Sequence, residues 1–300
     1  MEPSEWPHLR TLLEETSHVS VDQPPAKTSV VSRVNSAVGG FFETTTRAAT
    51  AVVTSPLRLL PLWKSPGWGL RYLMHYLRLV AGPTAWLYIA LSGMIVGFVA
   101  TYFTFKFLPY ADYTEPLLIE DLLRSTGFAL FRILVPVLAT ILIAARSGAA
   151  VASDIGGKSH GGQIDALRTL GTRPDRYLLT GVLYAFLIGT PLLITIGYLV
   201  ASLTSLVVFA ATHSQHGAMF WDLHFHRELR SPETWWYRGL GWVIAKTQLC
   251  AAGIALISYY RGARLKNSTR DVSLGITSAI LWATLYVLAV NFVFSFIEFE

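Results

Sequence analysis

The chain has 300 residues, of which 52% are hydrophobic and only 14% are charged, and its mean hydropathy is +0.45. Soluble domains usually carry about 25% charged residues, so this composition indicates a membrane protein. The net charge of +5 is spread over short loops without a basic block, which argues against a nucleic-acid partner and favours contact with anionic lipid. The single cysteine, Cys250, excludes an intrachain disulfide and a cysteine-based zinc site.

Residues 1–54 are polar and without clear periodicity, which predicts a mostly disordered cytoplasmic extension. Acidic residues within this stretch argue against a transit peptide, and its start lacks the apolar core of a signal peptide. Residues 56–79 mix Trp63 and Trp68 with Arg58, Lys64 and Arg71. This composition predicts a helix that lies in the membrane interface, with an ordinary juxtamembrane linker as the alternative.

Five segments are apolar over the roughly 20 residues that a helix needs to cross a bilayer. They are residues 83–107, 128–152, 177–209, 240–260 and 272–296. Pro136 and Pro191 fall inside two of these segments and predict kinks there. The sequence therefore predicts an all-α integral membrane protein whose residues 55–300 form one domain with an interfacial helix and five spans.

The basic residues of the short loops predict the orientation of these spans. The loop after the second span contains Lys158 and Arg168, and the loop after the fourth contains Arg261, Arg264 and Lys266. By contrast, the loop between the first and second spans is mostly acidic. We therefore expect the N-terminus in the cytoplasm and the C-terminus on the outer side.

The segment 153–177 is charged and rich in glycine, although apolar spans flank it. Its Gly-Lys-Ser sequence does not form a phosphate-binding loop, because position 152 is Ala152 and no β-strand precedes it. The G-x-S-x-G match at 157–161 also lacks the α/β sheet that a serine hydrolase requires.

Helical periodicity explains the segment better. Ile164, Leu167 and Leu170 share one helix face, Gly171 can end the helix in the left-handed conformation, and Pro174 prevents its continuation. The preceding glycines, at 156, 157, 161 and 162, allow a sharp bend where the chain leaves the bilayer. We expect a short amphipathic helix at 161–170, which is either a docking helix for a motor protein or a surface loop without a partner.

Two cations lie inside apolar spans, Lys246 about two turns and Arg132 about one turn from the outer side. Cations within a membrane are candidates for function, and a lipid phosphate is a complementary ligand. The alternative is that each side chain extends to the nearby interface.

The loop after the third span contains several histidines. Their spacing is compatible with a zinc site, although a flexible loop is the simpler interpretation. The candidate ligands are His213, His216, His224 and His226.

Four classes of function remain to be compared. An ion-coupled carrier would require paired acidic residues within its spans, and the sequence has none there. A membrane-embedded metalloenzyme would depend on the histidine-rich loop. A transport subunit and a scaffold or assembly subunit without transport both fit the pattern of spans.

The residues from Val135 to Leu179 resemble the MlaE (YrbE) family of ABC-transporter permeases, which move phospholipids between membranes. A proline in the span is followed by A-x-R-x-G-x-A, an acidic residue with Ile-Gly, a Gln-Ile-Asp-Ala-Leu helix, and then glycine and a Pro-x-Arg-Tyr exit. This chain supplies Pro136, Ala145, Arg146, Gly148, Ala150, Asp154, Ile155, Gly156, Gln163, Ile164, Asp165, Ala166, Leu167, Gly171, Pro174 and Arg176. It departs from the family pattern at Asp154 and Gly162, where glutamate is usual.

The resemblance implies a homodimeric permease in the bacterial inner membrane, with a plastid envelope as the alternative location. A cytoplasmic ATPase dimer would dock on residues 161–170, and an MCE-domain protein would bind on the outer side. ATP and Mg²⁺ would belong to the ATPase, with no cofactor in this chain. The implied coupling residues are Asp154, Gly156, Gln163, Ile164, Asp165, Leu167, Arg168, Leu170, Gly171 and Pro174.

Overall fold

The computed structural model describes residues 66–107, 119–171, 174–213, 215–230, 237–264, 266 and 268–299. These residues form helices and turns, with no β-strand among them, and all of them belong to one compact unit. The predicted extension at 1–54 and the first part of the predicted interfacial helix lie outside the described residues.

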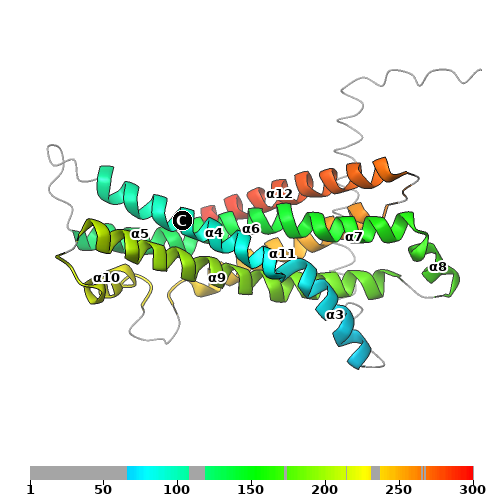
Figure 1. The fold of residues 1–300 in the computed structure, drawn as a ribbon, viewed down its shortest axis with the longest axis horizontal. Helices are drawn as coiled ribbons and strands as arrows, with labels where there is room; N and C mark the ends of the chain where they lie inside the picture. Colours follow the sequence, from blue (N-terminus) through cyan, green and yellow to red (C-terminus); the bar gives the residue numbers. More distant parts are fainter. Residues whose placement is uncertain are drawn as a thin grey trace, which may run out of the picture. The chain divides into compact units, whose positions relative to one another are not determined.

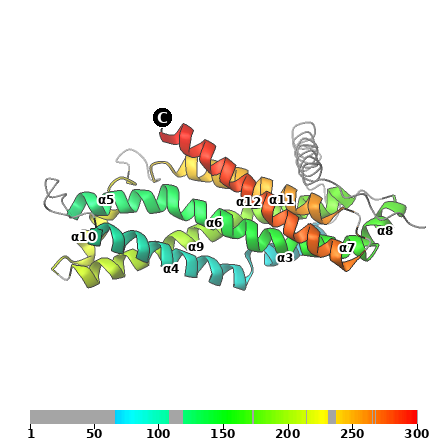
Figure 2. The ribbon, with the colours of Figure 1, turned by 90° about the horizontal axis from the view of Figure 1, so that it is seen from above.

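Five helical stretches are long and apolar enough to cross a membrane, and they run lengthwise beside one another (Figures 1 and 2). They confirm the predicted all-α membrane protein with five spans. Four of them contain α4 (Pro83–Phe107), α9 (Thr180–Thr212), α11 (Leu240–Gly262) and α12 (Thr269–Phe299). The second span is composite, with α5 (Ile119–Ala129), α6 (Val135–Ile143) and α7 (Ala149–His160) joined by the π-helical turns η2 (Leu130–Leu134) and η3 (Ala144–Gly148).

The second helical stretch, residues 119–160, is much longer than a membrane requires. At 1.5 Å per residue it extends for about 63 Å, roughly twice the thickness of the hydrocarbon core. The predicted span 128–152 is only its middle. Of the four glycines predicted to allow the bend, Gly156 and Gly157 do not take part in it, because both lie inside α7. The chain turns later, at Gly161 and Gly162, where Gly162 has a φ of 68°.

The first span is preceded by a separate helix, α3 (Pro66–Ala81), and the chain bends between α3 and α4 at Gly82. A Cβ at Gly82 would collide with the carbonyl oxygen of Arg78. Pro83 then starts α4 at a position where a missing N–H costs nothing. Tyr76 and Val80 are buried where α3 packs against α9.

Arg146 and Ser147, in the second span, satisfy the carbonyl groups at the end of α3. Arg146 Nη1 donates to the carbonyl oxygens of Leu79 (3.0 Å) and Val80 (3.1 Å), and its Nη2 contacts Thr84. Ser147 Oγ donates to the carbonyl of Val80 at 2.7 Å. Because helix ends leave carbonyls without intrahelical partners, this arginine fixes the bend between α3 and α4.

Small residues allow α4 and α9 to approach closely. The facing positions recur every four residues: Gly93 with Gly197, Gly97 with Ala201, and Thr101 with Ser205. A Cβ on Gly93 or Gly97 would collide with the backbone of α9. Thr101 Oγ1 donates to Ser205 Oγ at 2.8 Å in the buried continuation of this seam. Such small-residue contacts are typical of helix association within membranes.

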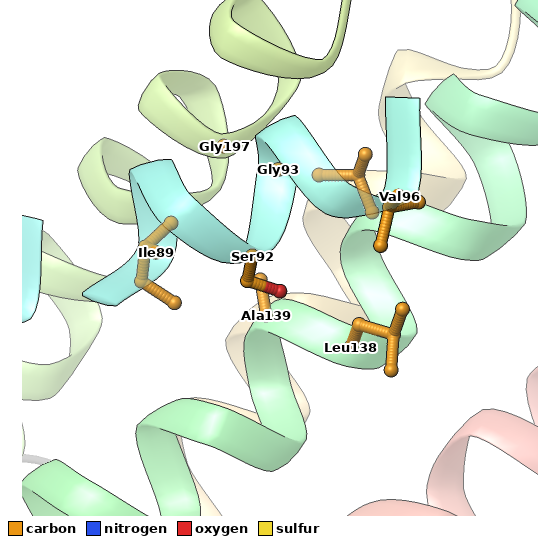
Figure 3. Close-up of a pocket in the computed structure, with 8 residues that line it drawn as sticks. Ile89, Ser92, Gly93, Val96, Leu138, Ala139 and Gly197 are labelled. Carbon is orange, nitrogen blue, oxygen red and sulfur yellow. The ribbon is translucent and has the colours of Figure 1, made fainter. Parts of the chain in front are cut away.

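A small hollow lies beside this seam, between α4, α6 and α9 (Figure 3). Ile89, Ser92, Leu138 and Ala139 are among its lining residues. Its volume is about 10 Å³, which accommodates at most one water molecule. The hollow is therefore a packing defect that Gly93 leaves, and no lipid chain fits it.

The first and fifth spans are peripheral. Only 22% and 17% of the apolar windows of these two spans are buried, against 44% for each of the other three. Large apolar side chains such as Leu87 and Phe103 on α4, and Leu285 and Phe292 on α12, are exposed on the described surface. These faces are suited to contact lipid or another apolar surface.

Candidate functional site

The predicted coupling segment forms the short helix α8 (Gln163–Thr169) at one end of the bundle (Figure 1). Gly162 precedes it with a φ of 68°, and Gly171 follows it with a φ of 72°. Both values favour glycine because a Cβ is strained there. The left-handed conformation expected at Gly171 is therefore present, and two glycines set the bounds of the helix.

The residues assigned to coupling do not share one environment. Ile164 is buried and holds α8 against the bundle, and Pro174 is also buried. Leu170, expected on the same face as Ile164, has 76% of its surface exposed. The assigned residues on the outer surface are Gln163, Asp165, Arg168, Leu170 and Gly171, and Arg168 pairs with Asp165 at 2.9 Å. The helix thus presents a mixed polar surface with one apolar residue at its end.

Asp154 is directed towards α3. Its Oδ2 atom lies 2.5 Å from Lys158 Nζ, and the same ammonium lies 3.1 Å from the hydroxyl of Tyr76. The Lys158 Nζ atom is also 5.1 Å from the centre of the Tyr76 ring. Asp154 is therefore linked to α3 through Lys158, and its contact with a motor protein stays a prediction.

The end of α7 is also attached to the loop between α11 and α12. Ser159 Oγ donates to the carbonyl of Arg264 at 3.1 Å, and a ring nitrogen of His160 lies 3.4 Å from the carbonyl oxygen of Lys266. Gly156 contributes by its small size, since a Cβ there would lie 3.3 Å from Val272 on α12. Movement of α8 would therefore be transmitted to three spans rather than to one.

The two cations predicted within the spans come together around a carboxylate. Arg132 Nη2 lies 2.8 Å from Glu298 Oε1, and Lys246 Nζ lies 3.3 Å from Glu298 Oε2. The side chain of Glu298 is completely buried, that of Lys246 is 2% exposed and that of Arg132 is 15% exposed. Neither cation extends freely to the interface.

Pro136 leaves a backbone carbonyl without its usual helical donor, and Lys246 binds that carbonyl. A residue at 136 would normally donate its N–H to the carbonyl of Arg132, four residues earlier, but proline has no N–H. That carbonyl instead accepts a hydrogen bond from Lys246 Nζ. The helix changes to π-helical geometry at Leu130–Leu134, directly before this proline. The second span begins at Ile119, so Arg132 lies farther from its outer end than predicted.

The four candidate metal ligands lie around α10 (Ala218–Phe225), which packs against α5 at the end of the bundle opposite α8 (Figures 1 and 2). His213 stacks on Phe209, whereas His224 lies 3.6 Å from a carboxylate oxygen of Glu120. His216 packs on Phe220, with 4.6 Å between ring centres. No group of three or more His, Cys, Asp or Glu residues suited to a metal ion occurs among the described residues.

His226 belongs to a polar network at the same end. Its Nδ1 atom lies 3.1 Å from Asp222 Oδ1, and Arg230 pairs with the other oxygen of Asp222 at 2.7 Å. Burial lowers the pKa of His226, although Asp222 opposes this effect. The Asp222 carboxyl has a lowered pKa because hydrogen bonds and charge from Arg230 and His226 outweigh its partial burial.

Sequence reasoning missed two members of these sites. Glu298 lies beyond the predicted end of the fifth span, although its charge next to an apolar run was a usable signal. Tyr76 was counted as part of an interfacial helix, and no sequence pattern relates it to Asp154 across about 80 residues.

Comparisons with known proteins agree with this architecture. The sequence profile of the family described as Permease MlaE matches residues 75–297. The chloroplastic protein trigalactosyldiacylglycerol 1 of Arabidopsis thaliana is 28% identical over 68% of this chain and 55% of its own length. A probable ABC transporter permease protein of Rickettsia typhi is 29% identical over 57% of this chain and 64% of its own length.

The intermembrane phospholipid transport system permease protein MlaE of Haemophilus influenzae is 24% identical over 73% of this chain and 80% of its own length. The chain thus spans 55–64% of the length of the Arabidopsis and Rickettsia relatives. The family match covers all five described spans, from α3 to the C-terminal end of α12. Because that match includes well over half of the chain, the protein belongs to the MlaE permease family.

Proposed function

We propose that this chain is the membrane-spanning subunit of an ATP-driven transporter that moves phospholipids between the inner and outer membranes of a bacterium. A separate ATPase dimer binds it through residues 161–170. Relatives named as ABC transporter permeases and as a phospholipid transport permease support this assignment. The N-terminus lies in the cytoplasm and the C-terminus in the periplasm, which the basic residues near α8 support.

The geometry of α8 is the observation that carries the proposal. The helix is anchored by Ile164, but most of its surface, including Leu170, has no contact within the described chain that would bury it. It is joined to α7 through only Gly161 and Gly162, and α7 continues the second span without interruption. A motor that grips α8 would therefore move a helix of 42 residues.

The partners follow from the remaining exposed surfaces. The peripheral faces of α4 and α12 provide apolar surface for lipid and for a second copy of the chain in a homodimer. At the opposite end, Met219 and Leu223 on α10 are exposed and offer an apolar contact for an MCE-domain protein on the periplasmic side. ATP and Mg²⁺ are held by the ATPase in this proposal.

Lys246 and Arg132 line the path of the lipid in this proposal and interact with its phosphate. Arg132 is the more exposed of the two cations that share Glu298. A lipid phosphate passing this point would accept charge-assisted hydrogen bonds from its guanidinium.

Affinity purification of the full chain from native membranes tests the proposal, with mass spectrometry of the proteins and lipids that accompany it. The informative variant is Leu170→Asp, which places a charge on the exposed end of α8. Leu223→Asp is the matched control, because Leu223 is 57% exposed at the other end of the bundle. We expect Leu170→Asp to lose the ATPase and Leu223→Asp to retain it.

Two outcomes would contradict the proposal. If the unmodified chain purifies without any ATPase, the scaffold interpretation replaces the transporter. If both variants retain the ATPase equally, the motor does not dock on α8.

A further inference from the structure

A cleft lies between the C-terminal end of α11 and the N-terminal end of α12, on the side of the bundle that also carries α8. Its volume is about 270 Å³, close to the lower end of the roughly 300–1,000 Å³ usual for small-molecule pockets. The lining residues are Arg261, Arg264, Lys266, Asp271, Leu274, Gly275 and Ser278. Three of these residues are cations and one is an anion.

The positive charge of this cleft is only partly balanced. Arg261 is 8% exposed, and its Nη2 atom is buried without a hydrogen-bond partner in the described part of the chain. Its guanidinium lies 5.5 Å from the centre of the Trp282 ring. One carboxyl oxygen of Asp271 accepts a hydrogen bond from the N–H of Ser268 at 3.1 Å. A buried donor without an acceptor is costly, which makes an anionic ligand favourable here.

Lys266 experiences the same excess of charge. Burial lowers the pKa of its ammonium, and the neighbouring Arg264 and Arg261 lower it further, against the opposing effect of Asp271. An anion in the cleft would reverse the contribution of these charges. The cleft therefore has the electrostatic character of a site that is completed by a ligand.

Gly275 provides the space that Lys266 occupies. A Cβ at position 275 would collide with Lys266 Nζ, while the nearest backbone atom, the carbonyl oxygen of Arg261, would lie 3.5 Å away. The glycine thus lets the ammonium approach α12. Replacement by alanine would displace the end of one flexible side chain and leave the backbone unchanged.

An apolar surface leads away from the cleft along α12. Leu274 lines the cleft and is exposed, and Leu281, Leu285 and Leu288 continue the exposed face towards the middle of the helix. These positions recur at helical spacing, so they form one stripe. A ligand with an anionic head and apolar chains fits this combination better than a free anion.

We propose that this cleft binds the phosphate of an anionic phospholipid headgroup from the cytoplasmic leaflet, with the acyl chains along the leucine stripe of α12. This lipid is a bound component separate from the transported cargo, and its leaflet rests on the proposed orientation. Basic pockets between spanning helices on the cytoplasmic side commonly hold such headgroups.

The bound headgroup would also steady the coupling region. The cleft residues Arg264 and Lys266 contribute the backbone carbonyls that contact Ser159 and His160 at the end of α7. Ordering of the cleft by a lipid would therefore order the segment directly before α8.

Native mass spectrometry of the purified full chain in detergent tests this inference without any ATPase or MCE-domain protein. The probes are phosphatidylglycerol, zwitterionic phosphatidylcholine and inorganic phosphate. The variants are Arg261→Gln and Gly275→Ala, and the control is Arg270→Gln, which removes an exposed charge from the first turn of α12 outside the cleft lining. Because no partner is needed, failure here is distinguishable from failure of the transporter proposal.

We expect phosphatidylglycerol to be retained in preference to phosphatidylcholine. Arg261→Gln should weaken its retention by about tenfold, Gly275→Ala should weaken it by a smaller factor, and Arg270→Gln should leave it unchanged. Equal retention by Arg261→Gln and Arg270→Gln would overturn the proposal. Binding of inorganic phosphate without any lipid preference would overturn the lipid assignment.

Discussion

Helix α11 carries a cation near each of its ends, and the two have different surroundings. Lys246 shares the completely buried carboxylate of Glu298 with Arg132. Arg261 lines a cleft with Arg264 and Lys266, where a buried nitrogen has no hydrogen-bond partner among the described residues. A charge that the chain itself balances contributes to folding, whereas a charge left facing a cleft is available to a ligand.

The largest expected effect is the loss of the balancing carboxylate at the first cluster. Glu298→Gln leaves two cations buried side by side, so the free energy of unfolding should fall by about 3–5 kcal/mol. Thermal unfolding in detergent measures this effect. The control is Asp165→Asn, which breaks the exposed pair with Arg168 and should cost less than about 0.5 kcal/mol. Similar losses for both variants would contradict the distinction between the two clusters.

Removal of a cation from the same cluster should be much less damaging. Lys246→Met keeps the pair of Arg132 and Glu298 but loses the contact of Lys246 with Glu298 and its hydrogen bond to the carbonyl of Arg132, at about 1–3 kcal/mol. In vesicles that contain the complete transporter, we expect lipid transport to decrease while the ATPase stays bound. Unchanged transport would discard the role of Lys246 in the substrate path.

A carboxylate added to the cleft should pair with its cations, as Glu298 pairs with Arg132 and Lys246. Ser278 lines the cleft, so Ser278→Asp supplies a counter-charge to Arg261 and its neighbours. We expect a stability gain of about 1 kcal/mol without lipid and a weaker retention of phosphatidylglycerol. Thr277→Asp, on the exposed side of the same helix, is the control and should change neither quantity. A lipid affinity that Ser278→Asp does not alter would place the bound lipid elsewhere.

The smallest expected effect is a pH dependence of stability that arises from His226, at the α10 end of the molecule, and that lipid binding at the cleft does not share. Burial lowers the folded-state pKa of His226 below its value of about 6.5 in the unfolded chain, so the unfolded chain binds the proton first. Stability should therefore decrease as the pH falls from 7.5 to 5.5, and less so in His226→Gln. Retention of phosphatidylglycerol at the cleft should stay constant over this range, because the arginine side chains of the cleft stay charged. A parallel loss of lipid in this pH range would contradict the assignment of permanent cations to the cleft.

Hydropathy was sufficient to predict the number of spans and the helical class, because a bilayer requires long apolar helices. It predicted the first span at 83–107, where Gly82 and Pro83 mark the start of α4. It failed for the second span, since α5 and α7 extend beyond the apolar segment as ordinary helix. Their stability comes from packing against α10, α11 and α12, which periodicity within one segment does not reveal.

The sequence was sufficient to recognise individual residues of the candidate sites, but not the contacts between them. Lys246 and Arg132 were recognised because cations in apolar runs are rare. Their common partner Glu298 required the contact between three helices that are distant in sequence. Likewise, Asp154 was recognised from the resemblance, and its i,i+4 pair with Lys158 lies within one helix, while the bond from Lys158 to Tyr76 depends on how α3 packs beside α7.

Site-directed crosslinking from α8 in native membranes tests the coupling of this chain to a motor most directly. The only cysteine, Cys250, is buried, so a cysteine introduced at Leu170 can be labelled selectively with a short photoactivatable crosslinker. A cysteine at Leu223, on the opposite end, is the control. We predict an adduct with an ABC ATPase from position 170 and none from position 223. An ATPase adduct from position 223 alone, or none from either position, would contradict the proposal that α8 couples ATP hydrolysis to transport.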